Sequence, residues 1–164
     1  MKQTYRAVAG LIALGVVVQA AAISFGWFDV LHKVDNGAVL DKDFGENAGL
    51  AIHGVNGMYV IPLLGLVLLV VSFVAGGSVP GGRKWAGIVF GLIVLQVVLA
   101  FVSFGAPIVG ALHGINALAV LGTAVRASLL ARERAGAGRT SVRGPVDVPQ
   151  QSTGSSMPHD ARKV

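Results

Sequence analysis

The chain has 164 residues, of which 54% are hydrophobic and 13% are charged, with a formal net charge of +5. A soluble domain of this size carries about a quarter charged residues, and its core is too small to bury so much apolar surface. The composition therefore excludes an ordinary soluble domain and favours a membrane protein. The absence of cysteine also excludes disulfides, iron–sulfur clusters and thioether-linked haem.

Four apolar stretches follow one another along the chain. A membrane-spanning helix needs about 20 predominantly apolar residues, and the stretches predict such helices at about residues 6–28, 49–75, 84–104 and 106–130. Ala20-Ala21-Ala22 resembles the cleavage site of a signal peptide, but the apolar run continues to Phe28 and is long enough to span the membrane. We expect an all-α membrane fold with a four-helix transmembrane domain over residues 1–131.

The charged residues lie at the ends of the apolar stretches, a distribution that argues against nucleic-acid binding. Basic residues precede the first stretch, end the 76–83 loop and follow the fourth stretch, whereas the 29–48 loop is mainly acidic. Because basic residues mark cytoplasmic loops, both termini are predicted to be cytoplasmic in a cell-membrane protein, with 29–48 as an outer loop. Residues 132–164 are rich in Gly, Ser, Pro and Arg and predict a disordered basic cytoplasmic tail.

A short motif occurs twice, 60 residues apart. Residues 52–57 read IHGVNG and residues 112–117 read LHGINA. The first and third helices match more loosely, since each carries one glutamine, Gln19 or Gln96, and a Ser-Phe-Gly sequence near its end. The chain is therefore predicted to be a four-transmembrane-helix bundle built from two parallel helical-hairpin repeats.

The repeat places His53 and His113 at a similar depth in the outer half of the bundle, where their imidazoles can face each other. Two neutral imidazoles on opposite sides of a flat cavity are the axial ligands that a six-coordinate haem iron needs. Zinc or copper is less favoured, because no carboxylate or thiolate accompanies the histidines. The alternative is that each histidine simply hydrogen-bonds a carbonyl or a lipid headgroup.

Other residues near the two histidines are predicted to support the site. On the same helical face, Asn56 and Asn116 follow the histidines by three positions, and the small residues Gly57 and Ala117 follow by four. Gln19 and Gln96 should face inward, because an unpaired amide in lipid costs several kcal/mol. For these glutamines we favour interhelical hydrogen bonds over contact with a cofactor. Pro62 is predicted to kink the second helix below the site.

These residues support a resemblance to a known family. The sequence Leu95-Gln96-Val97-Val98-Leu99, the turn at Pro107 and the pair Leu112-His113 resemble one four-helix half of haem A synthase, over about residues 5–131. The chain resembles equally closely small uncharacterised four-helix membrane proteins of actinobacteria that have a similar third and fourth helix. The resemblance implies a haem site with His53 and His113 as ligands.

The chain also departs from the synthases. It matches one bundle where they have two, it has no acidic residue directly before His53, and it lacks the cysteine pair of their outer loop. The resemblance therefore implies a single haem b site rather than the oxidation of haem O to haem A.

The leading hypothesis is a haem-binding membrane protein for electron transfer, haem handling or redox sensing, with a membrane redox partner. A second hypothesis is a non-enzymatic accessory subunit of a membrane complex, without a cofactor, whose basic tail docks a partner or anionic lipid. A transporter is less favoured, because the first three apolar stretches contain no buried charged residue. The sequence shows no recognisable catalytic motif and does not predict an enzyme.

Overall fold

The computed structural model describes residues 1–42, 44, 45 and 47–140, with side chains as far as Arg132. Its elements are, in chain order, α1 (Lys2–Asp35), α2 (Ala48–Val55), a π-helical segment (Asn56–Val60), α3 (Ile61–Val74), a short 3-10 turn (Gly76–Ser78), α4 (Gly82–Gly105) and α5 (Val109–Thr140). Within the described residues, four helical segments are long and apolar enough to cross a membrane, because α2, the π-helical segment and α3 form one continuous span. The predicted all-α, four-helix membrane fold is therefore confirmed.

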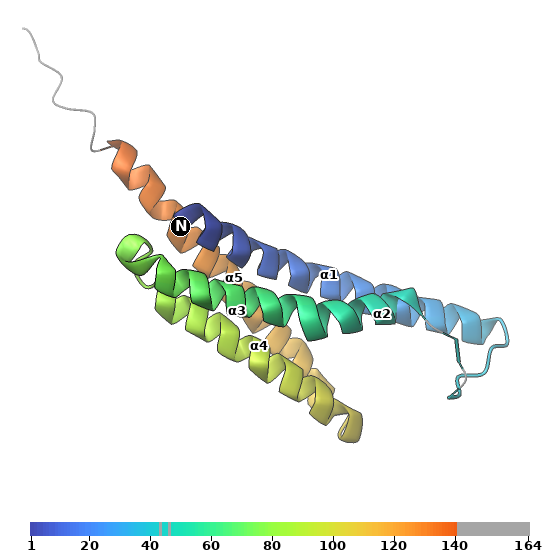
Figure 1. The fold of residues 1–164 in the computed structure, drawn as a ribbon. Coiled ribbons are helices and arrows are strands. Elements are labelled where there is room, and N and C mark those ends of the chain that lie inside the picture. Colours follow the sequence, from blue (N-terminus) through green and yellow to red (C-terminus); the bar gives the residue numbers. More distant parts are fainter. Residues whose placement is uncertain (43, 46, 141–164) are drawn as a thin grey trace, which may run out of the picture.

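The four spans form two antiparallel hairpins that lie side by side (Figure 1). The first hairpin consists of α1 and the α2–α3 span, and the second consists of α4 and α5. They pack through contacts of α1 with α5 and of α3 with α4. We call the end with the α1–α2 loop and the α4–α5 turn the loop end, and the opposite end the termini end. The hairpins spread apart toward the loop end.

Two long-range hydrogen bonds join the helices at the termini end. The buried hydroxyl of Tyr5 donates to the carbonyl oxygen of Gly82 at 3.0 Å, which ties the start of α1 to the start of α4. The hydroxyl of Ser128 donates to the carbonyl oxygen of Arg6 at 3.2 Å and ties α5 to α1. The first turns of α1 and α4 and the later part of α5 therefore lie at the same end of the bundle.

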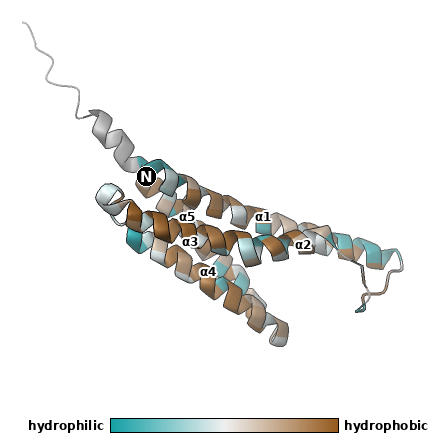
Figure 2. Cartoon of the chain, in the orientation of Figure 1, coloured by the Kyte–Doolittle hydropathy of each residue, from teal (hydrophilic) through white to brown (hydrophobic). Residues whose placement is uncertain are grey.

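Large apolar side chains cover the outside of the bundle. Phe28 is 73% exposed, Phe104 is 87% exposed and Ile108 is 83% exposed. The buried positions include many small residues, such as Ala9, Ala86, Ala124 and Ala127. Figure 2 shows hydrophobic residues along the length of each helix. Small residues between helices and large apolar residues outside are typical of packing in lipid.

The helices extend beyond the predicted spans. α1 continues to Asp35 rather than ending near Phe28, so that the loop shortens to residues 36–47. Hydropathy locates the apolar part of a helix, whereas polar residues can continue the helix outside the lipid. Here the ion pair of Lys33 with Asp29, at 2.7 Å and four positions apart, supports the added turns. α5 likewise continues past Leu130 to Thr140, and the rest of the predicted disordered tail, 141–164, lies outside the described residues.

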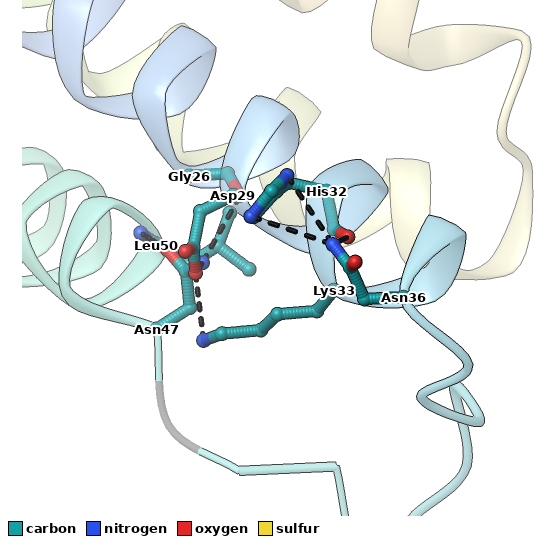
Figure 3. Close-up of polar contacts among 7 residues, drawn as sticks. All are labelled: Gly26, Asp29, His32, Lys33, Asn36, Asn47 and Leu50. Carbon is teal, nitrogen blue, oxygen red and sulfur yellow. Dashed lines mark hydrogen bonds and ion pairs between the residues drawn. The ribbon is translucent and has the colours of Figure 1, made fainter.

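The side chain of Asn47 joins α1 to α2 at the loop end (Figure 3). Its oxygen accepts a hydrogen bond from the backbone N–H of Leu50 at 3.0 Å and thereby caps the N-terminus of α2. Its amide nitrogen donates to the carbonyl oxygen of Gly26 at 3.0 Å and to the carboxylate of Asp29 at 2.5 Å. Asn47 is only 7% exposed, and its bond to the carbonyl of Gly26 is buried.

Replacing Asn47 with alanine is expected to lower the free energy of unfolding by about 2 kcal/mol, because the helix loses its cap and the carbonyl of Gly26 loses a partner. The matched control is Asn36→Ala, which removes an exposed amide at the end of α1 and is expected to cost less than about 0.5 kcal/mol. Unfolding curves of the purified variants in detergent give both values. Equal losses would show that Asn47 does not join the two helices.

Candidate functional site

Each hairpin contains a glutamine and a histidine that bind each other's backbone. The amide nitrogen of Gln19 donates to the carbonyl oxygen of His53 at 2.9 Å, and Nδ1 of His53 lies 3.2 Å from the carbonyl oxygen of Gln19. In the second hairpin, the amide nitrogen of Gln96 donates to the carbonyl oxygen of His113 at 3.0 Å, and Nδ1 of His113 lies 3.1 Å from the carbonyl oxygen of Gln96. The predicted interhelical hydrogen bonds of both glutamines are therefore present.

These contacts assign the tautomer of each neutral histidine. A carbonyl oxygen can only accept a hydrogen bond, so that Nδ1 of His53 and of His113 must carry the hydrogen. Nε2 is then the ring atom that keeps a free lone pair. A histidine that binds a metal through one ring nitrogen usually donates its other N–H to a carbonyl or a carboxylate. Both side chains are thus held in the form that a metal ligand requires.

The two histidine rings come close to each other although they belong to different hairpins. The ring centres of His53 and His113 lie 6.4 Å apart, and the ring planes are inclined by 57°. Both residues are half-buried. With a metal–nitrogen bond of about 2 Å on each side, the centres of two imidazoles that bind one ion from opposite sides lie about 6 Å apart. The observed separation fits that arrangement.

The number of ligands limits which metal group fits. Within the described residues, no group of three or more His, Cys, Asp and Glu side chains is placed to hold a metal ion together. Two histidines alone do not complete a protein zinc site, which has three or four protein ligands. They do suit haem, because the porphyrin supplies the remaining iron ligands.

The asparagines repeat the pattern of the histidines. The amide of Asn56 donates to the carbonyl oxygen of Gly15 at 3.2 Å, and that of Asn116 donates to the carbonyl oxygen of Leu92 at 2.9 Å. Gly15 and Leu92 each precede the glutamine of their helix by four residues. The hydrogen bonds of the two hairpins therefore correspond, which agrees with the predicted repeat, although duplication of the hairpin stays a prediction.

The Ser-Phe-Gly matches of the first and third helices do not share this register. Ser24 follows Gln19 by five positions, whereas Ser103 follows Gln96 by seven. Aligned on their glutamines and histidines, the hairpins no longer pair the two Ser-Phe-Gly sequences. The histidine and asparagine motif is consequently the part of the sequence match that the hydrogen bonds support.

The small residues after the histidines have different surroundings. A Cβ atom added at Gly57 would meet the amide nitrogen of Gln19 at too short a distance, so only glycine allows this amide to lie against the backbone of the second span. The matching position in α5 is Ala117, which carries a Cβ atom. At Gly54 and Gly114, which directly follow the histidines, an added Cβ would meet no atom of the described residues within 4 Å. The helix surface beside each histidine is therefore open.

Two hollows on the described surface lie away from the histidines. The first, of about 280 Å³, runs along α1 and is lined by Ile23, Ser24, Trp27, Phe28 and Leu31. The second, of about 210 Å³, lies at the α3–α4 connection beside Arg83. Neither of these hollows is lined by His53 or His113. The candidate site consists of the two rings between the hairpins and the open helix surface beside them.

The backbone after His53 is irregular. Asn56–Val60 form a π-helical segment, in which the backbone N–H of Ile61 bonds to the carbonyl oxygen of Asn56 five positions earlier. Pro62, for which a kink was predicted, stands at the start of α3 directly after this segment and has no N–H to donate. Single π-helical turns occur frequently at functional sites. The proline predicted an irregular backbone in the second span, but nothing in the sequence predicted that the residues before it form a π-helix.

Comparisons of the chain with protein-family models, with curated proteins and with solved structures found no match. The resemblance to haem A synthase and to actinobacterial membrane proteins therefore stays a prediction.

Proposed function

We propose that this multi-pass membrane protein binds one haem b between the second and fourth spans, with His53 and His113 as axial ligands. The observation that carries the proposal is the separation of 6.4 Å between the centres of the two rings, each with Nδ1 next to a backbone carbonyl. The protein would serve electron transfer, haem handling or redox sensing. A bound haem supplies a one-electron redox centre, whose potential depends on its axial ligands and their hydrogen bonds.

The surrounding residues support this role through the histidines. The backbone carbonyls of Gln19 and Gln96 orient the rings and keep the hydrogen on Nδ1. Their side-chain amides hold the histidine backbones in place. In this proposal Asn56 and Asn116 position the helices and do not contact the haem. Such supporting hydrogen bonds make the ligand nitrogen more basic and limit rotation of the ring.

We further infer that the termini end faces the cytoplasm and that the site lies in the outer half of a cell membrane. The bonds of Tyr5 and Ser128 gather the basic flanks of α1, α4 and α5 at one end; these flanks contain Lys2, Arg6, Arg83, Lys84, Arg126 and Arg132. The loop end carries Asp29, Asp35 and Asp41. Charge asymmetry of this kind favours cytoplasmic placement of the basic end.

The test uses variants that separate ligation from helix packing. In His53→Asn and His113→Asn, the asparagine amide lies near the original Nδ1 and can still donate to the glutamine carbonyl, but the free Nε2 is gone. We expect the wild-type protein, purified in detergent after haem-replete expression, to show a Soret band that shifts on reduction with dithionite. The six-coordinate low-spin spectrum should disappear in each variant. His32→Asn alters an exposed histidine on α1 and should leave the spectrum unchanged.

A wild-type protein without a Soret band, or a double variant that retains the same spectrum, would contradict haem binding. The alternative would then be favoured, namely an accessory subunit of a membrane complex in which Gln19, His53, Gln96 and His113 serve only to hold helices together. The observation that favours this alternative is that all four residues already make interhelical hydrogen bonds. Purification of a stoichiometric membrane partner without any chromophore would support it.

A further inference from the structure

The two halves of the candidate site are hydrogen-bonded unequally. The amide of Asn116 donates to the side-chain oxygen of Gln96 at 2.6 Å as well as to the carbonyl of Leu92. In the first hairpin, Asn56 donates to the carbonyl of Gly15, but the side-chain oxygen of Gln19 is buried and has no hydrogen-bond partner among the described residues. The support of His113 is therefore complete, and that of His53 lacks one bond.

Burial shows the same difference. Asn116 is 7% exposed and belongs to the interior of the bundle, whereas Asn56 is only half-buried. The two bonds of Asn116 are therefore made by a side chain packed inside the bundle, whereas the bond of Asn56 is made by a side chain that lies partly at the bundle surface. The glutamine that holds His113 is consequently fixed more firmly than the glutamine that holds His53.

The backbone behind the two histidines also differs. α5 is α-helical from Val109 to Thr140, including the residues that follow His113. The span of His53 changes to a π-helix at Asn56, three residues after the histidine, and meets Pro62 six residues later. A π-helical turn contains one residue more than an α-helical turn. Its conversion to an α-helix would rotate α2 relative to α3 by about 100° and would carry His53 away from His113.

We propose that the two histidines are unequal ligands, with His113 as the fixed ligand and His53 as the exchangeable one, so that a small neutral molecule can take the position of His53. This inference rests on the proposed haem site and names its ligand-binding side. The chemical class of the incoming molecule is a diatomic π-acceptor, for which carbon monoxide is the probe. The opening element would be α2 with its π-helical segment, hinged ahead of Pro62.

The first test compares the two histidine variants in the haem-loaded protein. His53→Asn is expected to keep its haem through gel filtration and, when reduced, to bind carbon monoxide at least about tenfold faster than the wild type, because no protein ligand has to leave first. His113→Asn is expected to lose most of its haem on the same column. Equal haem retention by the two variants, or loss from His53→Asn instead, would overturn the proposal.

The second test targets the close contact between Gly57 and the side-chain amide of Gln19. Gly57→Ala places a methyl group against the amide of Gln19, which should break its bond to the carbonyl of His53 and raise the rate of carbon monoxide binding by about tenfold. The control is Gly87→Ala in α4, away from the histidines, where the added methyl group meets no described atom within 4 Å and the rate should not change. Identical rates in Gly57→Ala and the wild type would contradict the proposal.

A third measurement needs no haem. Hydrogen–deuterium exchange of the haem-free protein in detergent should be at least about tenfold faster for residues 53–61 than for residues 113–121, because the π-helical turn opens at lower cost. Equal exchange in the two segments would overturn the proposed hinge. If the protein binds haem but the two histidine variants, and the two exchanging segments, give equal results, the proposed function is retained and only the proposal of unequal ligands is refuted. A protein that binds no haem would refute both.

Discussion

Replacing Gly49 with valine is expected to separate α1 from α2 and to lower the free energy of unfolding by about 3 kcal/mol. A Cβ atom at Gly49 would meet the backbone nitrogen of Gly26 and the carbonyl oxygen of Ala22 at distances that atoms do not adopt. Both are backbone atoms of α1 and cannot move aside as a flexible side chain can. Helices in membranes approach each other this closely only where small residues meet.

The opposite residue of the crossing leads to the same expectation. A Cβ atom at Gly26 would lie 2.8 Å from the backbone nitrogen of Leu50 and 2.9 Å from the side-chain oxygen of Asn47. A larger residue at either glycine would therefore also disturb the cap of α2. Because α2 carries His53, the same substitution should remove the six-coordinate haem spectrum of the proposed site.

The measurement is unfolding of the purified variants in mixed detergent micelles, with circular dichroism as the signal. Gly54→Val is the matched control, since it makes the same substitution in the same helix at a position with open space in the described structure. This control is expected to change the free energy of unfolding by less than about 0.5 kcal/mol. If both variants lost stability equally, the close crossing of α1 and α2 would be refuted.

Replacing Gln96 with leucine is expected to cost about 2 kcal/mol, and replacing Gln19 with leucine less than about 1 kcal/mol. Gln96 donates to the carbonyl of His113 and accepts from the amide of Asn116, so the substitution removes two interhelical bonds. Gln19 donates to the carbonyl of His53, but its buried oxygen has no partner among the described residues. Removal of an unpaired buried oxygen offsets part of the cost of the lost bond.

Unfolding of the haem-free proteins tests this difference, because without haem only helix packing contributes. A double variant, Gln96→Leu with Asn116→Leu, should cost less than the sum of the single variants, since the second substitution removes a donor that the first left without its acceptor. Equal losses for Gln19→Leu and Gln96→Leu, or strictly additive losses in the double variant, would contradict the unequal hydrogen bonding of the two hairpins.

The same histidines and glutamines belong to both hypotheses, the haem protein and the accessory subunit. The two hypotheses differ in what they require of the two nitrogens in each histidine ring. Nδ1 of each histidine is engaged by a glutamine carbonyl, which is sufficient for a packing role. Haem ligation needs, in addition, a free Nε2 on each ring and a separation of the ring centres like the observed 6.4 Å. The His→Asn variants remove Nε2 but keep a donor for the glutamine carbonyl, so they distinguish a haem protein from an accessory subunit.

The sequence alone determined the number of spans and the presence of His53 and His113 in matching motifs. Lipid offers no hydrogen bonds to the backbone, so an apolar stretch of about 20 residues has to form a helix. Helical periodicity then placed each asparagine on the face of its histidine. The helix ends were predicted less well, because α1 continues beyond the apolar stretch on polar residues such as Asp29 and Lys33.

Only the tertiary structure decided how the site is held. Each histidine and each glutamine binds a backbone carbonyl of another helix. Because every residue has a backbone carbonyl, the sequence does not indicate which one accepts the bond. The π-helical segment Asn56–Val60 and the close crossing of Gly26 with Gly49 likewise depend on contacts between helices. Among 23 glycines, only packing selects those that must remain glycine, because the penalty for a Cβ atom depends on what lies opposite.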